Sequence, residues 1–171
     1  MRRPAILVPI VLVGVVVTWF LLPNRLFYQR RRPTRVGKIV NRTWARYSAL
    51  GLPPGFWVTL EVRGRRSGRV HPTTLVVADH GGERYLVSML GEGAGWVRNV
   101  RVAGGEAVIR HGRRRNVRLE EVPAGQRAPI LKAYLKRAYG GRPHFSVSKD
   151  DPIEEFERIA SEYPVFRIVE S

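Results

Sequence analysis

The pattern of apolar and polar positions changes twice along the 171-residue chain. Residues 5–22 (AILVPIVLVGVVVTWFLL) carry no charge, and as a helix they span about 27 Å, close to the hydrocarbon thickness of a bilayer. Residues 35–50 repeat apolar side chains near a helical spacing, and from Trp57 onward short runs alternate apolar with polar residues. The pattern therefore predicts a membrane span, an amphipathic helix and a β-rich domain.

Short alternating runs between glycine-rich turns predict strands over 57–63, 73–78, 84–89, 106–111, 114–121 and 165–169. Helical spacing predicts a short helix over 96–102 and longer helices over 124–139 and 152–161. This order favours an α+β fold, mainly β, in which a small barrel is decorated by helices. The expected division is a transmembrane anchor (1–24), a basic juxtamembrane segment with the amphipathic helix (25–50), and the barrel domain (51–171).

Charge is distributed unevenly along the chain. The net charge is +16, and residues 1–40 contain eight basic residues and no acid. Six of these follow the apolar span and two precede it, so the positive-inside rule predicts a single-pass protein of the cell membrane with its C-terminal domain in the cytoplasm. The same flank would contact anionic lipid, which makes the lipid bilayer an expected partner. A cleaved signal peptide is the competing interpretation, but it requires a shorter apolar core and a small-x-small cleavage site.

The first candidate for chemistry is residues 63–69 (RGRRSGR), which join two predicted strands. Glycines let the backbone approach a ligand closely, and several guanidinium groups can hold an oxyanion in forked pairs. The segment lacks the GxxxxGK[ST] spacing of a phosphate-binding Walker loop. A charged hairpin tip without a ligand is the structural alternative.

The second candidate is residues 88–99 (SMLGEGAGWVRN). Here a predicted strand opens into a glycine-rich loop, followed by a helix that carries an aromatic residue, an arginine and an asparagine. Such a loop would let a planar ring lie against backbone N–H groups. An ordinary strand-to-helix connection is the alternative.

Taken together, these segments resemble the deazaflavin-dependent nitroreductase and quinone reductase family. The resemblance rests on GRRSGR, a strand ending near Ser88 and GWVRNVRVAGG, in that order. It continues through RHGRRRNVRLEEVP, APILKAYL and DPIEEFERIASEYPVFRI, so it covers roughly residues 58–168. It implies a split β-barrel of the FMN-binding type and the coenzyme F(420), a deazaflavin whose tail carries phosphate, lactate and several glutamates.

The resemblance also implies roles for individual residues. Five residues in or next to the arginine-rich turn would contact the phosphate and tail: Arg65, Arg66, Ser67, Arg69 and His71. Many relatives have an arginine at the position of His71. Ser88 and Met89 would line the deazaflavin ring, and Trp96, Arg98 and Asn99 would close the site. Tyr134 and Tyr139 would belong to the acceptor site as catalytic candidates, or would simply pack their helix on the barrel.

The implied activity is hydride transfer from the reduced coenzyme to a quinone or a nitroaromatic-type acceptor. FMN in place of F(420) stays open, as do a coenzyme carrier or sensor and a non-catalytic basic module that binds anionic lipid or nucleic acid. Nucleic acid is not an expected partner, because the strands show no interleaved aromatic and basic face. The sequence has no cysteine and its histidines are scattered, so no metal site is predicted. Related barrels often pair, which suggests a homodimer.

Overall fold

The computed structural model describes residues 28–29, 32–34, 37, 39, 43, 50–51 and 55–170. The predicted transmembrane span at 1–24 lies outside these residues, as does most of segment 25–50, in which Gly37, Ile39 and Thr43 are helical. β1 (Tyr28–Gln29) and β2 (Arg32–Pro33) form an antiparallel pair. Among the described residues, no helix has the length and apolar character needed to cross a membrane.

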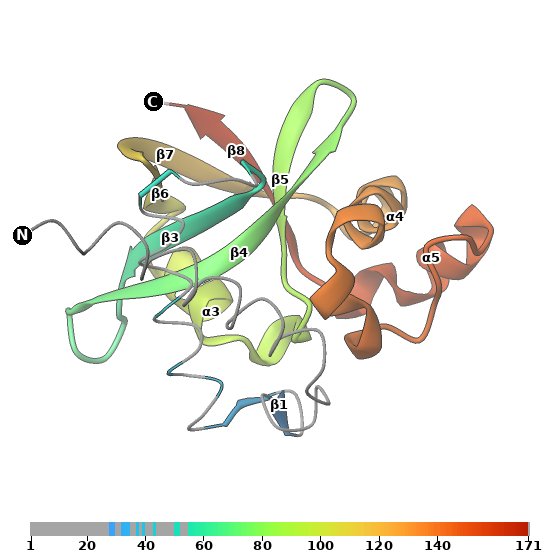
Figure 1. Ribbon diagram of the computed structural model, residues 1–171, viewed down its shortest axis with the longest axis horizontal. Helices are drawn as coiled ribbons and strands as arrows, with labels where there is room; N and C mark the ends of the chain where they lie inside the picture. The colour runs from blue at the N-terminus through green and yellow to red at the C-terminus, as the bar shows by residue number, and fades with distance from the viewer. Residues whose placement is uncertain are drawn as a thin grey trace, which may run out of the picture.

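Six antiparallel strands close into a barrel, which Figure 1 shows with its helices at the side and below. The strands are β3 (Trp57–Arg63), β4 (Val70–His80), β5 (Glu83–Val87), β6 (Glu106–His111), β7 (Arg113–Glu121) and β8 (Val165–Glu170). Their order around the barrel is β3-β4-β5-β8-β7-β6, so β8 closes the barrel between β5 and β7. This confirms the prediction of an α+β protein built on a barrel.

The barrel interior is filled by every second residue of its strands, as the period-two pattern requires. Val58 and Leu60 of β3 are fully buried there, together with Leu86 of β5. The helix α3 (Gly95–Val102) adds Val97 and Val100, spaced so that both face the barrel. This packing fixes α3, and with it the loop that precedes it, against the barrel.

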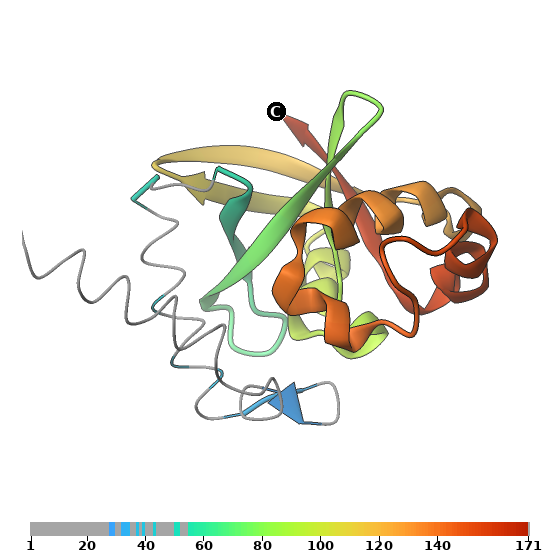
Figure 2. The ribbon, with the colours of Figure 1, turned by 45° about the vertical axis from the view of Figure 1, so that its right-hand side comes forward.

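A second apolar core, called here the outer core, lies between the wall of the barrel and two helices (Figure 2). The helices are α4 (Ala128–Arg137) and α5 (Ile153–Ile159). Residues next in sequence to the interior ones face this layer, so Val87 of β5 and Val165 of β8 pack with Leu131 and Phe156. One set of strands therefore separates two cores.

The predicted helix over 124–139 is divided in the structure. It consists of the 3₁₀ turn η3 (Ala124–Gln126), then α4, then the 3₁₀ segment η4 (Tyr139–His144). Pro129 lies in the first turn of α4, where its fixed φ angle suits a helix start and its missing N–H costs nothing. The helix therefore begins near the proline rather than at Ala124.

Candidate functional site

The arginine-rich segment forms a tight turn between β3 and β4. The Gly64 N–H donates to the Arg69 carbonyl at 2.8 Å, and the Gly68 N–H donates to the Gly64 carbonyl at 2.8 Å. A Cβ atom on Gly64 would lie 2.6 Å from Cδ2 of His71, and Gly68 has a φ of +65°. Both positions therefore require glycine, the first for space and the second for backbone conformation.

Two of the residues expected to contact a ligand hold the turn itself. Ser67 Oγ lies 3.2 Å from Nε2 of His71 and accepts a hydrogen bond from the Arg69 N–H at 3.3 Å. His71 thus has a place in the turn beside Gly64 and Ser67. Arg66 and Arg69 are exposed at the same turn.

The glycine-rich loop leaves β5 through a buried serine. Ser88 Oγ donates to the Gly91 carbonyl at 2.8 Å, and the Gly91 N–H donates back to the Ser88 carbonyl at 2.9 Å. The 3₁₀ turn η2 (Gly91–Gly93) follows, and a Cβ atom on Gly93 or Gly95 would meet no heavy atom within 4 Å. The backbone of the loop is therefore uncovered at Gly93 and Gly95. Met89 is half-buried against the outer core.

The two predicted segments meet at the start of the turn. Asn99 of α3 is buried, and its Oδ1 accepts hydrogen bonds from the backbone N–H of Arg65 at 3.3 Å and from Nη1 of Arg65 at 3.0 Å. Trp96 is half-buried beside Phe166, with the ring centroids 5.4 Å apart and the planes at 60°. Segments that are 34 residues apart in the sequence are thus joined by one amide side chain.

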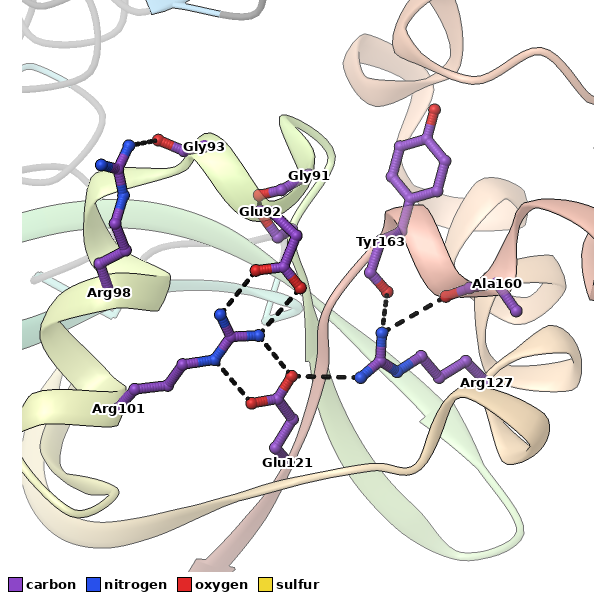
Figure 3. Close-up of polar contacts among 10 residues, drawn as sticks. Gly91, Glu92, Gly93, Arg98, Arg101, Glu121, Arg127, Ala160 and Tyr163 are labelled. Atoms are coloured by element: carbon purple, nitrogen blue, oxygen red, sulfur yellow. Dashed lines mark hydrogen bonds and ion pairs between the residues drawn. The ribbon is translucent and has the colours of Figure 1, made fainter.

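Arg98 has a partner that the sequence did not reveal. Its Nη2 donates to the Gly93 carbonyl at 2.5 Å, so this exposed arginine reaches back over the loop that precedes its own helix (Figure 3). The expected contact between Arg98 and the coenzyme is not tested by this geometry. The contact does show that α3 supports the loop.

Tyr134 and Tyr139 lie in different surroundings. Tyr134 is 3% exposed within the outer core, 5.9 Å from the Phe145 ring, and its hydroxyl would lie 3.1 Å from a Cβ atom on Gly141. Tyr139 is 58% exposed, and the Arg142 guanidinium lies 4.2 Å from its ring centroid. Tyr134 is therefore part of the core between the helices and the barrel, whereas the ring of Tyr139 is exposed to solvent.

Sequence reasoning missed a charged network next to the loop, drawn in Figure 3. Arg101 donates to both oxygens of Glu92 at 2.6 and 2.9 Å, and to both oxygens of Glu121 at 2.7 and 2.8 Å. Glu121 also accepts from Nη2 of buried Arg127 at 3.1 Å. The hydrogen bonds and charge of Arg101 hold the pKa of Glu92 below its ordinary value, and its carboxylate partners, Glu121 first, raise the pKa of Arg101. No spacing rule joins these residues, because Glu121 lies 20 positions beyond Arg101.

Similarity to solved structures extends to the fold. A protein of unknown function from Agrobacterium tumefaciens, Atu2129, superposes with a TM-score of 0.51 at 12% identity, over 88% of this chain and 60% of that one. An F(420)-H(2)-dependent reductase, FDR-A, gives 0.44 at 16% identity, over 66% and 93% of the two chains. A heme-binding protein of Mycobacterium smegmatis gives 0.46 at 14% identity, over 72% and 50%.

Membership of a family follows from the sequence match. No curated protein matches the chain significantly. Residues 32–150, more than half of the chain, match the family described as F(420)H(2)-dependent quinone reductase. This stretch contains the arginine-rich turn, the glycine-rich loop and α3. The chain therefore belongs to the F(420)H(2)-dependent quinone reductase family, a family of oxidoreductases whose coenzyme is F(420).

Proposed function

We propose that the protein transfers a hydride from reduced F(420) to a quinone or a nitroaromatic-type acceptor. One observation supports this most directly: the Arg65–Asn99 hydrogen bonds join the cationic turn to α3, the helix that directly follows the open glycine-rich loop. A coenzyme with an anionic tail and a planar ring requires both. The family match supports the same assignment.

The cationic turn fits the tail by its charge. Residues 63–72 contain four arginines and no acid, and Arg65, Arg66 and Arg69 are exposed. Guanidinium groups bind phosphate and carboxylate through paired, charge-assisted hydrogen bonds. Asn99 accepts hydrogen bonds from the backbone and the guanidinium of Arg65, so the direction of this arginine is fixed before any ligand binds. We assign the phosphate and tail contacts to these three arginines.

The loop fits the ring by its open backbone. Gly93 and Gly95 leave space where any other residue would project a side chain, and Ser88 fixes the start of the loop. When bound, the reduced deazaflavin supplies the hydride. The chain's own contribution is to orient the ring, bind the tail and hold the acceptor. Tyr139, exposed at the start of η4, is the candidate for the acceptor side.

The proposal is tested by titrating the full-length protein, purified in detergent, with reduced F(420), with and without menadione. We expect saturable binding and menadione-dependent oxidation of the coenzyme. Arg66→Ala should weaken binding, whereas Arg158→Ala, a cation on the exposed face of α5, should not. Binding without turnover on any quinone or nitroaromatic would instead indicate a carrier or sensor.

FMN is run in parallel as the alternative coenzyme of the same fold. Binding of FMN and not of F(420) would contradict the proposal. Replacing menadione with a nitroaromatic compound compares the two acceptor classes, and the ratio of their kcat/KM values decides which class the site prefers.

Two further features are proposed from the sequence. We propose that residues 5–22 anchor the protein in the cell membrane with the barrel domain in the cytoplasm, so that a lipid-dissolved quinone would meet the site. Deleting residues 1–32 should then release the protein from membranes and leave activity with soluble quinones intact. We also propose a homodimer, which light scattering of the same preparation would check.

A further inference from the structure

We infer that Arg101 is a positioning residue for the coenzyme site: it clamps Glu92 and thereby holds the glycine-rich loop, residues 88–95, in the conformation that receives the ring. The assignment of the ring to this loop rests on the proposed function. The effect of the clamp on the loop can be measured without coenzyme.

The fixed side of the clamp is Glu121, which buried Arg127 holds beside the outer core. Arg127 is 7% exposed, its Nε donates to the Val122 carbonyl at 2.8 Å, and its Nη1 donates to the carbonyls of Ala160 and Tyr163 at 3.4 Å. Its remaining nitrogen donates to Glu121, which is thereby held at the end of β7. A buried cation with these carbonyl partners has little freedom to move.

The movable side is the loop. Arg101 stands in the last turn of α3 and binds Glu121 with one edge of its guanidinium and Glu92 with the other (Figure 3). Glu92 lies in η2, whose backbone is otherwise held by the Ser88–Gly91 hydrogen bonds at one end and by Arg98 at the Gly93 carbonyl. Losing the Glu92 contact would leave the middle of the loop without its tie to the barrel.

An isolated surface ion pair contributes little, because solvent screens it and two long side chains must be ordered. This pair differs in two respects. The guanidinium is planar and binds both carboxylates through two hydrogen bonds each, and one carboxylate is already fixed by a buried arginine. Arg101 is therefore held in place before it binds Glu92, so less side-chain entropy opposes the clamp.

The clamp also settles the charge of the loop. Glu92 is the one acid in segments 63–72 and 88–102, which together carry six arginines. An unpaired carboxylate in the loop assigned to the ring would repel an anionic coenzyme. With Arg101 across both oxygens of Glu92, that charge is compensated and directed toward β7.

The deciding experiment measures hydrogen exchange of the peptide covering residues 88–96, without coenzyme, in the full-length wild type, Glu92→Ala, Arg101→Met and Arg101→Lys. We expect Glu92→Ala and Arg101→Met to speed exchange there about five- to tenfold, with Arg101→Lys between them and the wild type. Arg115→Ala breaks a more exposed pair, Arg115–Glu170 at 2.7 Å on β7 and β8, and should change nothing in this peptide. Because Arg101→Met also removes the contact with Glu121, Glu92→Ala carries the decision if the former fails to fold.

Coenzyme binding adds the functional readout. We expect Glu92→Ala to raise the Kd for F(420) by a similar factor and to leave kcat at saturating coenzyme within about twofold. Unchanged exchange in Glu92→Ala would overturn the inference, as would tighter coenzyme binding, which is expected if Glu92 acts only by repulsion. A wild type that binds no F(420) would refute the proposed function, while the exchange rates would still decide whether Arg101 holds the loop.

Discussion

Oδ1 of Asn99 accepts two hydrogen bonds from Arg65, one from its backbone N–H and one from its guanidinium. The amide thus fixes both the path of the β3–β4 turn and the direction of one of its cations. Because Asn99 is buried on a helix whose Val97 and Val100 pack into the barrel core, the position of the turn depends on that core.

Asn99→Ala should loosen the turn and weaken coenzyme binding. The substitution leaves the Arg65 N–H and Nη1 without their acceptor, which costs on the order of 1–3 kcal/mol where these groups stay away from water. Urea unfolding and F(420) titration measure the two effects. Asn116→Ala, on an exposed position of β7, is the matched control and should alter neither. Equal coenzyme affinity in Asn99→Ala and wild type would contradict the role given to this contact.

Three glycine-to-alanine substitutions should separate folding from binding. Gly64→Ala places a Cβ atom 2.6 Å from Cδ2 of His71 and 3.1 Å from the Arg69 carbonyl oxygen, so it should lower stability by about 1–3 kcal/mol. Gly93→Ala and Gly125→Ala meet no atom within 4 Å and should keep the melting temperature. Of these two, only Gly93→Ala should weaken F(420) binding, because only its methyl group enters the face assigned to the ring. An unchanged affinity of Gly93→Ala for F(420) would show that the ring does not bind against this loop.

Acid should release the Glu92 clamp. Arg101 lowers the pKa of Glu92 in the folded protein, so the contribution of the pair is fully present above the ordinary value of 4.5 and is lost as the pH falls through the lowered folded pKa. Melting temperatures of wild type and Glu92→Gln should differ by about 2 °C near neutral pH and converge well below that value. A difference that persists at about pH 3 would show that the effect does not come from the carboxylate charge.

The two tyrosines should give opposite results. Tyr134→Ala opens a cavity in the outer core beside Phe145 and should cost about 3–5 kcal/mol of stability. Tyr139→Phe keeps the ring under Arg142 and removes only an exposed hydroxyl, so stability should be unchanged. If that hydroxyl serves the acceptor, kcat with menadione should fall in Tyr139→Phe while the Kd for F(420) stays the same. Unchanged kcat would remove Tyr139 from the acceptor site.

The sequence predicted a strand at each of the six barrel positions, because short apolar runs recur there between turn residues. The limits of β3 and β6 match the predicted ranges, since Val58, Leu60 and Val62 report the barrel interior directly. It also singled out both segments that the Arg65–Asn99 hydrogen bonds join. It could not predict that Asn99 joins them, because a lone polar residue on a short helix carries no sign of its partner 34 positions away.

The roles of polar residues were harder to foresee for the same reason. Ser67 and Ser88 each bind the backbone of their own segment, and their contacts with a ligand stay predictions. A hydroxyl has the same appearance in a sequence whether it organises a turn or contacts a coenzyme. The Arg101 network was missed because its members come from a loop, a helix and a strand, and only the closed barrel brings them together.

The position of β8 has a consequence for how the protein is made. Val165 packs into the outer core and its neighbour Phe166 into the barrel, so a strand near the C-terminal end completes both cores. Its partners, β5 and β7, pair Arg167 with Tyr85 and Ile168 with Leu119, contacts that span long stretches of chain. Such distant pairings slow folding, since a long loop must close before the contacts stabilise it. During translation the barrel would stay open, its apolar lining in reach of chaperones, until residue 170 has left the ribosome.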